Sequence, residues 1–127
     1  MKNQSEVETL EKLIGQFQGL HSEISLLAKK APSDGLNNFK LSLINRALEN
    51  ANKVLGPRYL PFAGFDGFDA DDVPSTSDVT LVLSQYMEEA ERYRADNIQK
   101  THSGWFYVID GILSEVQTGA PAKVGRK

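Results

Sequence analysis

Two basic side chains and two tyrosines are the residues of this chain that could bind a small molecule. His21 lies in the middle of the apolar stripe of a predicted helix, where a titratable ring is unusual. Arg94 lies at the margin of a second apolar helix face, near Tyr86 and Tyr93. A guanidinium beside aromatic rings can hold a phosphate or carboxylate and stack on a flat base. These four residues form a candidate site for an anionic metabolite or nucleotide, provided that the two helices are neighbours.

Each of these basic groups also has a structural interpretation. A partly buried His21 can fix the register or oligomeric state of packed helices, as buried polar residues do in coiled coils. Arg94 can lay its aliphatic stem along the edge of a helix bundle and keep its charge in water. The sequence favours these structural roles and leaves the anionic ligand site as the alternative.

The stretch "FAGFDGFDADDVPSTSD", residues 62–78, contains enough aspartates to raise the question of a metal site. An EF-hand calcium loop needs oxygen ligands at its first, third and fifth positions, glycine at the sixth and glutamate at the twelfth. A frame from Asp69 puts Pro74 sixth, and a frame from Asp66 puts Phe68 third. Neither frame meets the requirement, so we expect no metal site.

The same region has aromatic residues spaced by three, namely Tyr59, Phe62, Phe65 and Phe68. We expect these rings to pin a long connector onto the helices while the aspartates face water. One of the hydroxyl residues at 75–77 then caps the next helix.

Nothing in the sequence indicates catalysis. There is no cysteine, which excludes thiol nucleophiles and thiolate zinc sites. His102 lies in a turn without a neighbouring nucleophile or orienting carboxylate. The sequence also lacks a phosphate-cradling glycine loop and a serine elbow. We therefore expect neither an enzyme nor a bound cofactor.

The composition is that of one small globular domain. The 127 residues are 40% hydrophobic and 24% charged, and no apolar run is long enough to enter a membrane. The formal charge of -3 and the pI near 5.4 oppose nucleic-acid binding, which requires a dense basic surface. The start, "MKNQSEVETL", lacks the pattern of a signal or transit peptide, so we expect a cytoplasmic protein.

Three segments have apolar residues at helical spacing, and we expect helices at about 5–30, 36–55 and 76–100. In the first segment a heptad pattern widens into an apolar stripe, broader than two neighbours in a small bundle can cover. Gly56 and Pro57 end the second segment, and residues 56–75 form the connector. The uncovered part of the stripe predicts contact with another chain.

Residues 104–118 change to a strand pattern rich in aromatic and β-branched side chains. Asp110 and Gly111 form a two-residue turn, which predicts a β-hairpin. With this turn Trp105 faces Val116 on one side of the hairpin. The other side carries three apolar residues, Phe106, Val108 and Leu113.

Together these segments predict an α+β fold that is mostly α: a three-helix bundle with a C-terminal two-stranded β-hairpin. We expect a single domain over residues 1–127, with a loose basic tail at 119–127. The expected function is that of a homo-oligomeric assembly protein that binds other proteins and acts as a regulator or inhibitor of a partner. Its expected contact residues are Ile14, Phe17, Ile24, Trp105 and Val108.

Overall fold

The computed structural model describes all of residues 1–127 and contains three long helices followed by three short strands. The elements are α1 (Gln4–Lys30), α2 (Asn38–Tyr59), α3 (Thr76–Ala95), β1 (Ile98–Thr101), β2 (Gly104–Ile109) and β3 (Ile112–Thr118). The strands form one antiparallel sheet in the order β1-β2-β3. The chain is therefore α+β and mostly α, as the sequence predicts, with one strand more than expected.

Each helix begins at a polar residue whose side chain caps it. The side-chain oxygens of Asn3, Asn37 and Ser75 accept hydrogen bonds from backbone N–H groups three residues later, at 2.9, 2.8 and 3.1 Å. The cap at Asn37 explains why α2 begins at Asn38 rather than near residue 36. None of the three helices has both the length and the apolar character that crossing a membrane requires.

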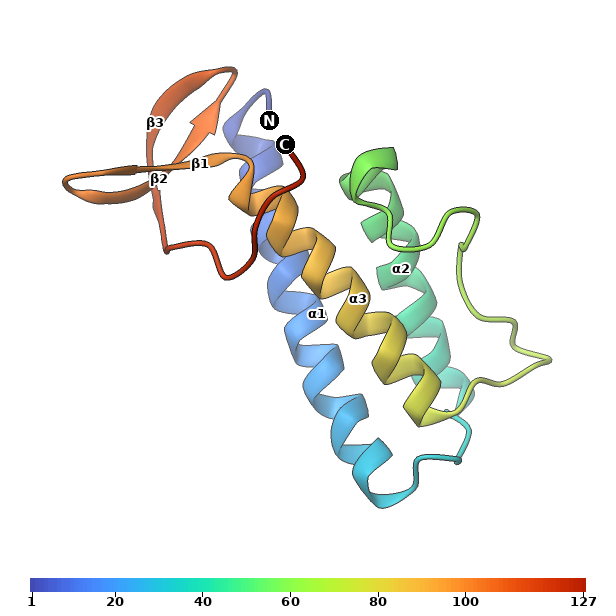
Figure 1. The fold of residues 1–127 in the computed structure, drawn as a ribbon. Helices are drawn as coiled ribbons and strands as arrows, with labels where there is room; N and C mark the ends of the chain where they lie inside the picture. The colour runs from blue at the N-terminus through green and yellow to red at the C-terminus, as the bar shows by residue number, and fades with distance from the viewer.

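The helices lie along one another in an order that differs from their order in the sequence (Figure 1). α1 and α3 lie side by side and run in opposite directions, whereas α2 runs in the same direction as α3. The connector after α2 must therefore travel back along the helices before α3 begins. This geometry explains why the connector is long.

The three helices share one hydrophobic core of sixteen buried residues. α1 contributes one side of the core through Leu10 and Phe17, and α3 contributes Leu83 and Tyr86. The rings of Phe17 and Tyr86 stack with centroids 5.8 Å apart. The predicted interface residues Phe17 and Ile24 are 1% and 2% exposed, so the core of their own chain covers them. They are not available to a second chain.

α2 differs from its prediction near both of its ends. Phe39, an apolar residue of the predicted helix segment, is 71% exposed, while Leu41 is buried. Near its C-terminus the helix kinks at Gly56, whose φ of 69° ends the regular turn, and Pro57 starts a further turn that reaches Tyr59. The helix therefore extends four residues beyond the predicted end.

The predicted third helix is too long, because its last residues form a strand. α3 ends at Ala95, and Ile98–Thr101 pair with β2. Ile98 lies opposite Tyr107, and Lys100 lies opposite Trp105. Pairing with β2 explains why the β-branched end of this segment leaves the helix, and it converts the predicted hairpin into a three-stranded sheet.

The turn between β2 and β3 matches its prediction, but the register does not hold along the whole hairpin. Asp110 and Gly111 have φ values of 54° and 76°, as a type I′ turn requires. The pairing then shifts between Phe106 and Val108, so that Trp105 pairs with Thr118 and not with Val116. The cause is a bulge in β3.

In the bulge the Ser114 hydroxyl donates to the carbonyl of Tyr107 at 2.7 Å. The same hydroxyl oxygen accepts from the N–H of Val116 at 3.1 Å. These bonds hold the irregular part of β3 against β2.

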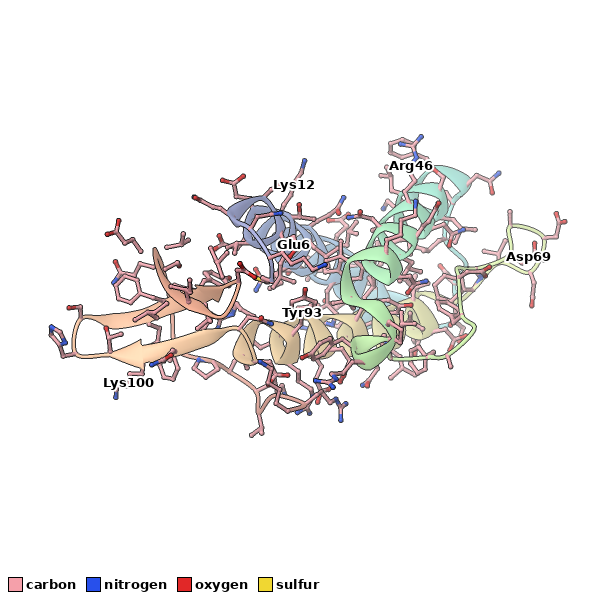
Figure 2. All side chains as sticks on the ribbon, turned by 90° about the horizontal axis from the view of Figure 1, so that it is seen from above. Glu6, Lys12, Arg46, Asp69, Tyr93 and Lys100 are labelled. Carbon is pink, nitrogen blue, oxygen red and sulfur yellow. The ribbon has the colours of Figure 1, made fainter.

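The aromatic rings of the connector pack as the sequence predicts. Phe62, Phe65 and Phe68 form a chain of edge-on contacts, and the last two pack on the core. Asn45 of α2 fixes the connector further: its amide donates to the carbonyl of Phe68 and its oxygen accepts from the Phe68 N–H, both at 2.8 Å. Figure 2 shows Asp69 projecting from the connector into solvent. No three acidic or histidine side chains gather as a metal site would require.

Candidate functional site

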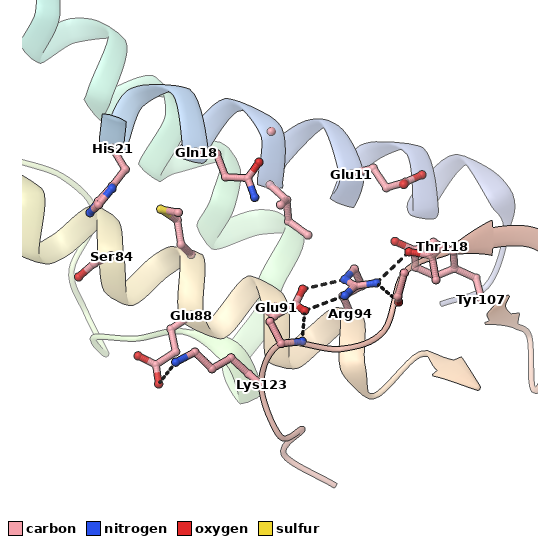
Figure 3. Close-up of a pocket in the computed structure, with 15 residues that line it drawn as sticks. Glu11, Gln18, His21, Ser84, Glu88, Glu91, Arg94, Tyr107, Thr118 and Lys123 are labelled. Carbon is pink, nitrogen blue, oxygen red and sulfur yellow. Dashed lines mark hydrogen bonds and ion pairs between the residues drawn. The ribbon is translucent and has the colours of Figure 1, made fainter. Parts of the chain in front are cut away.

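A groove lies between α1 and α3 and is closed on one side by the chain after β3. We call it the α1–α3 groove; its volume is about 750 Å³. Figure 3 shows His21 and Ser84 at one end, and Arg94, Tyr107 and Thr118 at the other. The remaining lining residues are Glu11, Ile14, Gly15, Gln18, Met87, Glu88, Glu91, Gly119, Ala122 and Lys123.

Small residues keep the groove open. Gly15 lies inside α1, where glycine costs about 1 kcal/mol relative to alanine. A Cβ atom on Gly15 would meet no other atom within 4 Å, so packing within the chain does not require glycine there. Gly119 is equally unobstructed on the opposite wall. The empty space beside α1 is the reason that the groove reaches the backbone of the helix.

Arg94 closes one end of the groove with a complete set of hydrogen bonds. Its Nε and one terminal nitrogen donate to the two carboxylate oxygens of Glu91, each at 2.7 Å. The remaining N–H groups donate to Thr118 Oγ1 at 2.8 Å and to the carbonyls of Gly119 and Ala120 at 2.9 and 2.8 Å. All five donors of the guanidinium are engaged, so none is free for an anion.

The electrostatics of the Arg94–Glu91 pair favour its charged form. Burial acts to raise the pKa of Glu91, but hydrogen bonds from Arg94 and from the Ala122 N–H outweigh it and hold that pKa below its usual value. The hydrogen bond to Glu91 raises the pKa of Arg94. The pair is therefore ionised, and it ties α3 to the chain after β3.

That chain, residues 119–127, is fixed to α3 and is not the loose tail that its composition predicts. Ala122 N–H donates to Glu91 at 2.7 Å, and Arg92 donates to the carbonyl of Val124 at 2.7 Å. Arg126 forms a two-pronged pair with the buried carboxylate of Glu89, at 2.9 and 2.7 Å. Basic residues of the tail thus meet acidic residues of α3, a complementarity that only the folded chain brings together.

Tyr107 reaches the groove from the sheet with an unsatisfied hydroxyl. The residue is 0% exposed, and its hydroxyl lies near Thr118 and Arg94 without forming a hydrogen bond of ordinary geometry to either. Figure 3 shows the side chain beside Arg94 and Thr118, whose own polar atoms are bonded to each other. Burial raises the pKa of Tyr107, so the hydroxyl is protonated at neutral pH.

Replacing Tyr107 with phenylalanine is expected to stabilise the protein by on the order of 1 kcal/mol, because it removes a buried polar atom that has no partner. Urea denaturation of the wild type and of Tyr107→Phe measures the difference. The matched control is Tyr86→Phe, which removes a hydroxyl that donates to Asn52 at 2.6 Å and should destabilise. A loss of stability in Tyr107→Phe would show that its hydroxyl has a partner.

Only two of the four residues predicted to bind an anion line the α1–α3 groove. His21 and Arg94 both line the α1–α3 groove, which confirms that their helices are neighbours, but they lie at opposite ends of it. Tyr86 is buried in the core, and Tyr93 packs against Tyr59 with ring centroids 4.8 Å apart. Neither tyrosine lines the groove.

The sequence did not indicate three polar groups of the groove, Glu11, Gln18 and Tyr107. Glu11 and Gln18 lie on the same face of α1 as His21, but the polar residues of that face have the sequence pattern of an ordinary solvated helix surface. In the sequence, Tyr107 is one of several aromatic residues of a predicted strand, and nothing distinguishes it from the others. A glycine inside a helix is a signal that the sequence offers, but α1 has two, Gly15 and Gly19, and only Gly15 lines the groove.

The groove lacks an arrangement for covalent catalysis. Ser84 and His21 face the same end, but the Ser84 hydroxyl donates to the backbone carbonyl of Leu81 at 2.7 Å. No base activates it. The charged lining residues are three acids (Glu11, Glu88, Glu91) and two bases (Arg94, Lys123), which leaves one net negative charge with His21 neutral.

Comparison of the chain with protein-family models, with curated proteins and with solved structures found no match in any of the three.

Proposed function

We propose that this chain is a non-enzymatic assembly protein of the cytoplasm, a three-helix bundle that self-associates through its sheet. The supporting observation is a sheet face with three apolar residues that is turned away from the helices. Tyr107 is buried, so its face of β2 is turned toward the helices. The alternate residues Phe106 and Val108 belong to the opposite face, where Val108 pairs with Leu113.

The outer face of the sheet consists of Phe106, Val108 and Leu113, flanked by Gln99 and Gln117, which both pair with Phe106. On this face Leu113 is 42% exposed, whereas Phe106 and Val108 are half-buried. Figure 2 shows the strands extending beyond the ends of the helices, so that a second molecule could reach this face. Apolar surface of this kind is a candidate protein interface.

The edges of the sheet are less suitable for docking than the outer face. β3 carries the bulge, which interrupts the row of backbone groups that a pairing strand would use. β1 has only four residues, and one of them is Lys100. Short, charged or bulged edge strands resist edge-to-edge pairing. We therefore assign the contact to side chains of the outer face.

A second copy of this chain is the occupant that fits the face best. In a two-fold interface each residue near the axis meets its own counterpart, so a charged face would repel itself. Gln99, Phe106, Val108, Leu113 and Gln117 of the outer face are uncharged, and the alternation of β3 adds one charged side chain, Glu115, between Leu113 and Gln117. Two such faces can pack on each other in an arrangement that keeps the Glu115 carboxylates of the two copies apart.

Replacing Val108 with lysine is expected to convert the dimer into a monomer, because it places a charge at the centre of the outer face. Light scattering at high micromolar concentration measures the mass, which should be twice 14.1 kDa for the wild type and 14.1 kDa for Val108→Lys. Leu81→Lys is the matched control, since Leu81 is exposed on α3, and this variant should remain dimeric. A wild type of monomer mass at this concentration contradicts the proposal.

The alternative, a binder of anionic metabolites or nucleotides, has less support. It depends on Arg94, whose five donors are engaged within the chain, and the groove carries a net negative charge. A thermal-shift screen with nucleotides and organic acids tests this alternative, and a stabilisation that Arg94→Lys abolishes would favour it over assembly.

A further inference from the structure

Residues 122–127, "AKVGRK", lie along α3, and we call them the strap (Figure 1). No strap residue is buried, and the side chain of Val124 is 81% exposed. Neither Ala122 nor Val124 packs against the hydrophobic core. A surface segment held by polar contacts alone opens at a lower free energy than the core does. The strap can therefore leave α3 while the helices stay folded.

Three side chains of α3 and its C-cap bind the backbone of the strap. Glu91 accepts from the first N–H of the strap at 2.7 Å, and Arg92 donates to the carbonyl of Val124 at 2.7 Å. Asp96 accepts from the N–H of Arg126 at 2.8 Å. Contacts to the backbone fix the path of a bound segment, whereas its side chains give specificity. This surface is therefore built to hold a peptide.

Two positions of the strap are selective. A Cβ atom at Gly125 would overlap the Asp96 carboxylate, so only glycine lets the backbone approach so closely. Arg126 donates to both carboxylate oxygens of Glu89, at 2.9 and 2.7 Å. The Glu89 side chain is only 8% exposed, and arginine is the cation that matches a carboxylate with two N–H groups. The surface therefore selects the pair Gly-Arg.

The charges around this pair favour a basic segment. Lys123 lies 4.0 Å from Glu88, and the Lys127 ammonium donates to the carbonyl of Asp96 at 3.0 Å (Figure 3 shows the first contact). When the strap leaves, Glu89 keeps one partner, because the Nε of Arg92 lies 3.2 Å away. The empty surface is thus an acidic site that does not collapse.

We propose that this surface of α3 recognises a basic, extended segment of another protein that contains the pair Gly-Arg, and that the strap is an autoinhibitory copy of that segment. In the free chain the strap occupies the surface. A partner segment enters when the strap opens and makes the same contacts with Glu89, Glu91 and Asp96. The surface is separate from the outer face of the sheet, so the proposal goes beyond self-association and does not depend on it.

The full-length variant Gly125→Val tests the proposal, because it prevents the strap from docking and leaves α3 unchanged. The probe is a fluorescent peptide with the sequence of residues 120–127, acetylated and amidated, followed by anisotropy. It should bind Gly125→Val saturably, one peptide per chain. It should bind the wild type at least about tenfold more weakly, because the tethered strap competes at a high effective concentration. Val124→Ala is the matched control in the strap and should behave as the wild type does.

Altered peptides and a second substitution test the selectivity. A peptide with valine in place of its glycine, or with lysine in place of its arginine, should bind Gly125→Val at least about tenfold more weakly. Adding Glu89→Gln to Gly125→Val should weaken binding of the unaltered peptide by as much. Adding Glu49→Gln, which removes an exposed charge on α2, should not. A contact that depended on charge alone would not distinguish lysine from arginine.

Hydrogen exchange of the same variant shows whether the strap has opened. In Gly125→Val the amides of Ala122 and Arg126 should lose protection, while the amide of Leu48 in the core keeps it. The proposal is overturned if the strap amides stay protected, if Leu48 loses protection with them, or if the opened variant does not bind the peptide. Conversion of a wild-type dimer into a monomer by Gly125→Val would assign the surface to the strap of a second copy and overturn its assignment to another protein.

Discussion

Replacing Arg94 with alanine is expected to lower the free energy of unfolding by about 3 kcal/mol and to release residues 119–127 from α3. The side chains of Arg94 and Glu91 are only 12% and 16% exposed, so removing one partner leaves a poorly solvated charge. The mutation also removes the donors that hold Thr118, Gly119 and Ala120. Both losses lower the free energy of unfolding.

Urea denaturation measures the change in stability, and hydrogen exchange of the backbone amide of Ala122 measures the release of the tail. Arg46→Ala is the control, since Arg46 is exposed on α2 and should change stability little. The stability of Arg94→Lys should lie between those of Arg94→Ala and Arg46→Ala, because an ammonium group cannot reproduce the two-pronged contact with Glu91. If Arg94→Ala denatures like Arg46→Ala, the five bonds do not stabilise the fold.

Replacing Asn52 with alanine is expected to destabilise the protein by about 2 kcal/mol. Asn52 joins three parts of the structure: its amide donates to the carbonyl of Phe65 at 3.0 Å, and its oxygen accepts from the Tyr86 hydroxyl at 2.6 Å. Alanine would leave the Tyr86 hydroxyl buried without an acceptor, which costs more than the lost bond alone.

A double-mutant cycle of Asn52→Ala with Tyr86→Phe separates the two bonds. The second mutation removes the unsatisfied hydroxyl, so the double variant should be more stable than the sum of the single changes predicts. Asn50→Ala, at an exposed position of the same helix, is the control. Additive effects in the cycle would show that Asn52 and Tyr86 are not coupled.

The parts of the fold that could be predicted from the sequence depend on local patterns. The apolar stripe predicted a helix at about 5–30, and the helix spans Gln4–Lys30; Phe17 and Ile24 of this stripe are buried within the chain, although they were predicted to contact a second one. The Asp110-Gly111 turn produced a hairpin because both residues tolerate positive φ. These outcomes require only periodicity and turn chemistry.

The predictions were wrong where contacts with residues distant in the sequence determine the local structure. Ile98–Thr101 follow a helix and continue its charge pattern, but pairing with β2 makes them a strand. The tail was predicted to be loose because its partners, Glu89 and Glu91, lie some thirty residues earlier in the chain. The stripe of α1 was predicted to need another chain because the sequence does not show how much of it α3 covers.

The candidate site was predictable only in part for the same reason. The sequence singled out Arg94 for its position beside an apolar face, but not the bonds from Thr118, Gly119 and Ala120 that engage it. The same limit applies to Tyr107, since an unpaired hydroxyl is a property of its folded surroundings and not of its neighbours in the sequence.

The order of the helices in space has a consequence for how fast the chain folds. α1 makes its most extensive helix contact with α3, which means that residues 31–75 must be closed into a loop before that contact forms. The cost in chain entropy precedes the gain from packing, and such non-local contacts slow folding. We therefore expect a folding rate below that of helical bundles whose neighbours in sequence are neighbours in space. Shortening the connector between α2 and α3 should accelerate folding only slightly, because this entropy depends on the logarithm of loop length.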